Sequence, residues 1–272
     1  AMRHGATSYV AEYTVSTVTV PNEDVKGRII GAGGRNIRTF EREAGVEIEI
    51  DETNEIRVSS FDSIRREIAR RALELLIKDT RIQPSRIEEV VRLVRTQMDD
   101  VLLEEGKKIV HDCGVFNLPL ELVRLIGRYK FRTSYGQNLG IHTIEETKIG
   151  VSLASEVGAG VDIVRLGCLL HDIGKVVTEE EGTHVQTGVA TLKKYGLPKE
   201  VVVCVAEHHE DKPFSSVEST IVWIADAISG SRPGARYEPH EDYVNRMEKI
   251  EDVAKGFDGV ETVYAFQAGR DV

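Results

Sequence analysis

The sequence predicts an α+β protein that is mostly α-helical and built from two domains. At 272 residues the chain is longer than a single domain usually is. Between residues 12 and 80, strand-like and helix-like stretches follow one another in the order β-α-α-β-β-α. From Leu118 onward the apolar spacing is almost wholly helical. We therefore expect a small mixed domain followed by an all-helical bundle.

The composition limits the possible classes of function. A formal net charge of -10 argues against a protein that coats nucleic acid by bulk charge, so any nucleic-acid site must be local. Three widely separated cysteines, Cys113, Cys168 and Cys204, are typical of free thiols in a reducing compartment. No apolar run approaches the roughly 18 to 20 residues that span a bilayer, and no signal peptide is recognisable. We expect a soluble, cytoplasmic polypeptide.

The elements of the first domain can be predicted in order. Residues 1–11 have no periodic pattern and are set aside as a tag or disordered leader. Residues 13–20 are rich in β-formers and stop at Pro21, which predicts a strand. A short helix over 24–28 and a second helix ending near Ala44 follow. Residues 46–50 and 56–58 predict a hairpin, and Asp62 is the expected N-cap of an amphipathic helix that ends near Lys78.

A glycine-rich turn, Ile30-Gly31-Ala32-Gly33-Gly34-Arg35-Asn36-Ile37, separates the first two helices. Glycine allows a nucleic-acid backbone to approach where a Cβ would block it, and helix N-terminal amides can face phosphates. A plain tight turn or a dinucleotide-binding loop would also use glycines. However, Gly31 follows a helical segment, and no βαβ pattern surrounds it.

In its element order and its Gly-x-x-Gly turn, this segment resembles a type I KH domain, which implies RNA binding. The resemblance, together with the local charge, assigns RNA contacts to Arg28, Gly31, Ala32, Gly33, Gly34, Arg35 and Arg38. With Lys26 and Arg42, the arginines are expected to form a local basic patch.

The rest of the chain is predicted to be helical. Pro84 suits the first turn of a long helix from about Ser85 through Lys108, which we expect to connect the domains. A coiled coil is an alternative for this helix, although its apolar stripe covers few heptads. Further helices are expected over 119–128, 137–157, 161–173, 184–195, 199–210, 217–229 and 240–255, and a final strand over 260–267. The expected domains are a KH-like domain 12–80, a connecting helix 81–117, a helical domain 118–256 and a truncated C-terminal segment 257–272.

Histidines and aspartates recur through the helical region. An adjacent pair, His171-Asp172, leaves an apolar run, and each other candidate lies in a segment with a helical pattern: His142, His184, His208, His209 and Asp226. Any one of them alone is more simply a satisfied structural residue. Together, imidazoles and carboxylates from several helices of a bundle suit a divalent metal such as Mn, Mg, Fe, Zn, Co or Ni. For His111 and His240, which lie outside this series, a structural or surface role is expected.

This ordered series resembles the HD-domain phosphohydrolases, in the form that holds two metal ions. The resemblance implies that His142, His171, Asp172 and Asp226 hold one ion, and that Asp172 bridges to a second ion held by His184, His208 and His209. In single-metal members of this class the latter histidines position phosphate instead. His171, Asp172 and Lys175 are the expected catalytic residues, with Lys175 close enough to the pair to contact phosphate.

The pairing of the two domains resembles the ribonuclease Y family. The resemblance also rests on Phe131-Arg132-Thr133-Ser134-Tyr135-Gly136-Gln137-Asn138, on Ser231-Arg232-Pro233-Gly234-Ala235-Arg236 and on Phe266-Gln267-Ala268-Gly269-Arg270. It implies a bacterial metal-dependent endoribonuclease that initiates mRNA decay on single-stranded RNA, as a homodimer or larger assembly, with RNA-decay proteins as partners. It further implies that this chain is a fragment of a protein anchored at the cytoplasmic face of the membrane. The family usually has a charged pair where this chain has Ala32-Gly33.

The expected reaction is in-line attack on an RNA phosphodiester by water activated between two ions, with Lys175 neutralising developing charge. Arg232 and Arg236 follow a ligand closely, and could contact phosphate or equally pair with acidic helices. Two other classes remain open at this point. One is a phosphohydrolase of nucleotides or cyclic dinucleotides in which the KH segment is an interaction module. The other is a non-catalytic RNA-binding protein, which the complete ligand series fits poorly.

Overall fold

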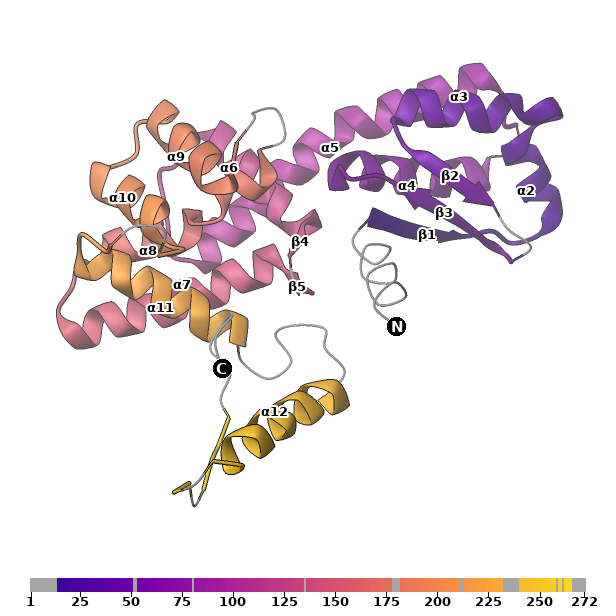
Figure 1. Cartoon of the computed structure of the whole chain (residues 1–272). Coiled ribbons are helices and arrows are strands. Elements are labelled where there is room, and N and C mark those ends of the chain that lie inside the picture. Colours follow the sequence, from indigo (N-terminus) through magenta and orange to yellow (C-terminus); the bar gives the residue numbers. More distant parts are fainter. Residues whose placement is uncertain are drawn as a thin grey trace. The chain divides into compact units, whose positions relative to one another are not determined.

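The computed structural model describes residues 14–50, 53–79, 81–134, 136–177, 182–210, 213–231, 240–257, 259–260 and 262–265 (Figure 1). The chain divides into two compact units, residues 1–103 and 104–272. The boundary falls within α5 (Pro84–Asp112), whose first part belongs to unit 1 and whose last turns belong to unit 2.

Unit 1 is a three-stranded antiparallel sheet with helices packed against it. Its elements are β1 (Val15–Thr19), α2 (Glu23–Ile30), η1 (Ala32–Gly34), α3 (Arg35–Ala44), β2 (Glu47–Ile50), β3 (Glu55–Ser59) and α4 (Ser63–Lys78). The strand order is β1-β3-β2, with Val18 opposite Ile56 and Ile48 opposite Val58. The predicted order β-α-α-β-β-α is confirmed.

Local chemistry explains where these elements begin and end. The Asn22 carboxamide accepts a hydrogen bond from the Val25 amide at 3.0 Å and caps α2. Asp62 caps α4, as predicted, by accepting from the Ile64 amide at 2.8 Å. Gly45 ends α3 at φ 68°, a left-handed conformation that glycine adopts without strain. Beneath them, buried side chains from every layer form the core, among them Val18, Val25, Ile29, Phe40, Ile56, Val58, Leu73 and Leu76.

Unit 2 is a helical bundle. Its elements after α5 are α6 (Leu120–Gly127), η2 (Arg128–Phe131), β4 (Thr133–Ser134), β5 (Gln137–Asn138), α7 (Leu139–Val157), α8 (Val161–Leu170), η3 (Ile173–Val176), α9 (His184–Lys194), α10 (Lys199–Glu207), α11 (Val217–Ser231) and α12 (His240–Lys255). Helix α7 packs along α8 and α11, and α10 packs against α8, α9 and α11. The closest of these packings use glycine, since a Cβ at Gly150 of α7 would lie 2.6 Å from the sulfur of Cys168 on α8.

Several predicted boundaries differ from the structure. The hairpin β4-β5 was not predicted, and it delays the start of α7 to Leu139. Helices α8 and α10 end at Leu170 and Glu207, so residues 171–173 and 208–210 lie beyond them. In the predicted strand 260–267, residues 260 and 262–265 are not in a strand, and the others lie outside the described residues. In the part of the chain that the structure describes, no helix is both long and apolar enough to cross a membrane.

Candidate metal centre

The seven predicted ligands come together in unit 2, and six of them lie at helix ends. His142 is in the first turn of α7, His171 and Asp172 follow the last residue of α8, His184 is the first residue of α9, and His208 and His209 follow the last residue of α10; Asp226 lies within α11. Helix termini from separate elements thus converge on one place, which is how bundle cores present metal ligands.

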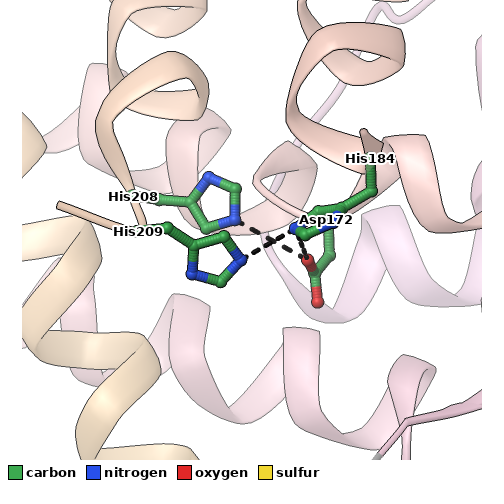
Figure 2. Close-up of side chains that lie close together, drawn as sticks. All are labelled: Asp172, His184, His208 and His209. Atoms are coloured by element: carbon green, nitrogen blue, oxygen red, sulfur yellow. Dashed lines mark hydrogen bonds and ion pairs between the residues drawn. The ribbon is translucent and has the colours of Figure 1, made fainter. Parts of the chain in front are cut away.

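Four of these residues form what we call the outer cluster: Asp172, His184, His208 and His209 (Figure 2). Their ligand atoms all lie within 4.8 Å of one another. The Nε2 atoms of His184 and His208 are each 3.8 Å from Oδ1 of Asp172, and the Nε2 atoms of His184 and His209 are 2.7 Å apart. Three imidazoles therefore face one carboxylate.

A second group, the inner cluster, consists of His142, Glu146, His171 and Asp226, with ligand atoms again within 4.8 Å of one another. His142 Nε2 is 3.2 Å from Asp226 Oδ1 and 3.4 Å from Glu146 Oε2. His171 Nε2 lies 3.2 Å from Oδ2 of Asp172, a member of the outer cluster. The adjacent pair His171-Asp172 thus joins the two clusters.

Hydrogen bonds at Nδ1 orient the three most buried histidines. Nδ1 of His171 lies 2.8 Å from the carbonyl oxygen of Cys168, and Nδ1 of His208 lies 2.7 Å from that of Val205. Because a carbonyl oxygen can only accept, each Nδ1 carries a proton. His142 Nδ1 lies 2.9 Å from the Ser229 hydroxyl, which itself donates to a carboxylate. In all three rings Nε2 is left to face the clusters, as metal ligation requires.

The buried polar atoms of the site lack partners of the kind that a folded core normally supplies. Nε2 of His171, Nε2 of His208, Oδ1 of Asp172 and both carboxylate oxygens of Glu146 are buried without a hydrogen-bond partner among the described residues. Leaving such groups unsatisfied costs about 1–3 kcal/mol each, and more for charged groups. A divalent cation would satisfy them together, so the residues present fit the metal that the sequence predicts.

Charge within the site favours the anionic form of Asp172 and Asp226, whereas burial raises the pKa of the third carboxyl group, Glu146. Burial would raise the pKa of Asp172, but His171, His208 and Lys175 hold it well below its usual range. Burial likewise acts to raise the pKa of Asp226, and His142 and His171 bring it to about 2 instead. Both side chains are therefore anionic at neutral pH.

Two histidines of the outer cluster, His184 and His209, are held neutral. The pKa of His209 is lowered to about 4 by burial and by the neighbouring His208 and His184. Burial also lowers the pKa of His184. A neutral imidazole has a free lone pair, so these rings are in the form that can bind a metal ion.

The backbone around the ligands is shaped by particular residues. Gly174 lies against the first turn of α9, where a Cβ would be 1.8 Å from the carbonyl oxygen of His184. Thr183 begins that helix with a capping box to Gln186. After the His208-His209 pair, Glu210 turns the chain with φ 59°. Glycine and a helix cap thus bring His184 to Asp172.

Lys175 lies next to the clusters. Its Nζ is 2.6 Å from Oδ2 of Asp172. A phosphate contact by Lys175 stays a prediction.

The Gly-x-x-Gly turn of unit 1 has the backbone that its sequence predicts. Gly31, Gly33 and Gly34 have φ values of 71°, 60° and 74°. A Cβ at Gly31 would lie 2.6 Å from the side chain of Asn36, which donates to the carbonyl oxygens of Arg28 and Ile82 at 2.9 and 3.1 Å. Glycine is therefore required at Gly31 by both conformation and space.

The predicted basic patch is smaller in the structure than in the sequence. Lys26 is buried at 5% exposure with its ammonium 2.7 Å from Glu23, so it does not belong to a surface patch. Its place on the inward side of α2 explains this, because a long stem can be buried while the charge is paired. Arg28 pairs with Asp24 at 3.3 Å, and Arg42 pairs with acidic neighbours.

Two predicted arginines remain beside the turn. Arg38 donates to the carbonyl oxygen of Gly33 at 2.7 Å and so supports the loop. Arg35 is exposed at the start of α3 and has no ion-pair partner among the described residues. These two, with the exposed Ala32 and Gly33 of the turn, are the part of the predicted RNA surface that is exposed and forms no ion pair among the described residues.

Sequence reasoning missed two buried participants. Glu146 lies four residues after His142 on α7, a spacing that puts both on one helix face and could have revealed it. Ser229 lies three residues after Asp226 and left no comparable signal. Arg232 and Arg236 lie outside the described residues, as do residues 266–270.

Comparison with known proteins gives the class of protein first. Residues 15–75 match the model of the KH domain, and residues 139–231 match that of the HD domain. The chain therefore combines a KH domain with an HD domain.

Curated relatives then define the family. The chain is 48% identical to Ribonuclease Y of Alkaliphilus metalliredigens over 100% of its length, 49% identical to that of Finegoldia magna over 98%, and 47% identical to that of Acetivibrio thermocellus over 100%. It covers 58%, 52% and 52% of those proteins, so it spans about half the length of the relatives that it matches. No solved structure gave a significant match. The chain belongs to the ribonuclease Y family, of which it contains the KH and HD segments.

Proposed function

We propose that this chain is the RNA-binding and cutting part of a metal-dependent endoribonuclease that hydrolyses phosphodiester bonds of single-stranded RNA. The observation that carries the proposal is the convergence of two four-residue ligand clusters joined by His171-Asp172. The KH domain in the same chain and the names of the relatives favour RNA as the substrate. Because those relatives are about twice as long, the activity of the whole protein is inferred.

We assign one divalent ion to His142, His171, Asp226 and Asp172, and a second to His184, His208, His209 and Asp172. The proposal rests on the 3.2 Å contact between His171 and Asp172, which places Asp172 at the junction of the clusters. The family and the donor chemistry favour Mn, Mg, Fe, Zn, Co or Ni, since imidazole and carboxylate together suit divalent cations of this range.

Bound ions would supply a low-pKa water and would neutralise charge on a phosphoryl oxygen. The chain itself would orient the reactants. Nδ1 hydrogen bonds fix the directions of His142, His171 and His208 before any ion binds, so little reorganisation is needed. Lys175, once released from Asp172, would be close enough to contact a phosphate oxygen of the substrate.

The KH unit would hold the RNA. Its Gly-x-x-Gly turn presents backbone without side chains beyond the methyl of Ala32, and Arg35 stands exposed beside it. This turn lacks the charged pair that the family usually has, so we expect modest affinity and strong dependence on salt.

The family resemblance also leads us to propose a wider setting for the whole protein. We infer that it initiates mRNA decay as a homodimer, with other RNA-decay proteins as partners. We also infer that it lies in the cytoplasm, held at the membrane by a segment outside this chain.

The test compares the 272-residue chain with its Asp172→Asn variant on two substrates, an end-labelled single-stranded RNA and a cyclic dinucleotide. Both proteins are first freed of metal and then supplied with Mn²⁺, Mg²⁺ or Zn²⁺. We expect metal-dependent internal cleavage of RNA by the wild type and its loss, by at least about 100-fold, in the variant. Asn is nearly isosteric with Asp, so circular dichroism should show the same helical content.

Three outcomes would contradict the proposal. Cleavage that persists in Asp172→Asn would exclude this centre as the source of activity. Hydrolysis of the cyclic dinucleotide without cleavage of RNA would make the chain a small-molecule phosphodiesterase. RNA binding without metal uptake by the wild type would make it a non-catalytic RNA-binding protein.

A further inference from the structure

Glu146 is a buried carboxylate that the expected ligand series leaves unexplained. Its side chain has 0% exposure, and its Oε2 lies 2.9 Å from Nδ1 of His171 and 3.4 Å from Nε2 of His142. An anion in such a place is costly unless a cation compensates it. The cost is compounded by Asp226, a second carboxylate in the same cluster. A positive charge between the two carboxylates, from a protonated His142 or His171 or from a metal ion, would offset this cost.

The neighbours of Glu146 show where that charge would be. His142 and Glu146 are one helical turn apart on α7, and His142 Nε2 lies 3.4 Å from Glu146 Oε2 and 3.2 Å from Asp226 Oδ1. Such separations are those of neighbouring donors around one ion whose bonds are about 2.0–2.2 Å long. Because His142 Nδ1 is engaged by Ser229, its Nε2 is the atom available for that ion.

With Glu146 included, the two clusters differ in chemistry. The inner cluster has two imidazoles and two carboxylates, His142, His171, Glu146 and Asp226; the outer cluster has three imidazoles and one carboxylate, His184, His208, His209 and Asp172. Carboxylate oxygen favours harder ions such as Mn²⁺ and Mg²⁺, whereas imidazole suits Zn²⁺ and other borderline ions. The inner cluster thus has one carboxylate more and one imidazole fewer than the outer cluster, and a shared Asp172 would add a further carboxylate to the inner site.

We propose that Glu146 is a direct metal donor of the inner cluster, and that the centre is therefore unequal, with a carboxylate-rich inner site for an ion such as Mn²⁺ and an imidazole-rich outer site for an ion such as Zn²⁺. This inference rests on the proposed metal-dependent function and specifies the cofactor of the same site.

A second role for Glu146 is conceivable from the same geometry, and the test separates it. Glu146 Oε2 is also 2.9 Å from Nδ1 of His171, where it could orient that ring as a hydrogen-bond acceptor. However, Nδ1 of His171 already donates to the carbonyl oxygen of Cys168 at 2.8 Å. Gln at position 146 would keep an acceptor oxygen but lose the charge, so Glu146→Gln preserves an orienting role and removes a donor role.

The experiment uses the metal-free chain loaded with one equivalent of Zn²⁺ and titrated with Mn²⁺, whose electron paramagnetic resonance signal reports the free ion. In the wild type we expect one further Mn²⁺ per chain. In Glu146→Gln, Mn²⁺ binding should weaken by at least about 10-fold, while the zinc absorption edge, which reports the imidazoles around Zn²⁺, stays unchanged. In His209→Ala the zinc edge should change. Glu156→Gln, an exposed carboxylate on the same helix, is the matched control and should behave as the wild type.

Folding is checked on the metal-free proteins by fluorescence of Trp223, the single tryptophan, which lies in unit 2. Because Gln keeps an oxygen that can accept a hydrogen bond from Nδ1 of His171, Glu146→Gln should still fold before metal is added. Unchanged Mn²⁺ affinity in this variant would overturn the donor role. If the variant does not fold, the zinc absorption edge of the wild type still tests the proposal. An edge showing that the first Zn²⁺ binds mainly to carboxylates would overturn the proposed difference between the two sites.

The proposal and the proposed function can fail separately. If the wild type binds both ions as expected but does not cleave RNA, the function is wrong and the assignment of Glu146 stands. If RNA is cleaved while Glu146→Gln binds Mn²⁺ normally, the function stands and the assignment fails.

Discussion

Replacement of Gly174 by alanine should move the start of α9, with His184, away from Asp172 in the outer cluster. A Cβ at this position would lie 1.8 Å from the carbonyl oxygen of His184 and 2.6 Å from Oγ1 of Thr187. The first is a backbone atom, so no side chain can turn away to make room. The first turn of α9 must retreat by about 1 Å or more to reach a tolerable contact.

The cost follows from that displacement. Overpacking a tight interior usually costs about 1–3 kcal/mol, and we expect the upper end because backbone is displaced. The same shift should move His184, whose Nε2 is 3.8 Å from Oδ1 of Asp172, and weaken Zn²⁺ binding by at least about 10-fold.

The assay is urea unfolding of metal-free protein, followed by the fluorescence of Trp223, with a parallel Zn²⁺ titration. Gly188→Ala is the matched control because it lies on α9 but its Cβ would meet nothing closer than 3.4 Å. In the helix interior alanine should be neutral or stabilising by up to about 1 kcal/mol. Equal stability and equal Zn²⁺ affinity of the two variants would refute the packing argument.

Two further predictions concern other parts of the molecule. Gly31→Ala should weaken binding of single-stranded RNA, because its Cβ would lie 2.6 Å from Asn36 at a φ of 71°. Gly27→Ala is the control, because nothing lies within 4 Å of its Cβ, and it should bind RNA as the wild type does. Equal RNA affinities of the two variants in a fluorescence-anisotropy titration would contradict the prediction. The three buried cysteines should resist alkylation at pH 8, because burial raises the pKa of Cys113 and of Cys204 to about 11. Mass spectrometry should show all three modified only after unfolding. Since unfolded thiols ionise near pH 9 and the buried ones do not, unit 2 should lose stability as the pH rises from about 9 towards 11.

The fold was largely predictable because each unit has long periodic elements. Asp62 caps α4 as expected, and the alternating residues of β2 and β3 form the hairpin. Two-residue strands such as β4 and β5 are too short to leave a pattern. Alternation over 260–267 did not produce a strand in the described residues, since alternation shows a face and not a pairing partner.

The site was predictable in its identity but not in its form. Spacing and residue type indicated the histidines and aspartates, yet periodicity continued α8 through His171 and α10 through His208, past their real ends. Apolar periodicity does not show where a helix ends when the residues after its last turn are polar but buried. Glu146 was overlooked because a glutamate on a helix is usually taken for a solvent-facing residue, and only its 0% exposure shows otherwise.

The ends of α8 and α10 have the same arrangement, a histidine directly after the last helical residue whose ring donates to the carbonyl of the residue three positions before it. The last turn of each helix therefore fixes the orientation of the imidazole ring that follows it. Longer connections between the ligand-bearing helices should therefore leave the ring orientations of His171 and His208 unchanged, because those orientations depend only on the preceding helical turn. A deletion within the last turn of either helix would instead remove the reference point of its imidazole.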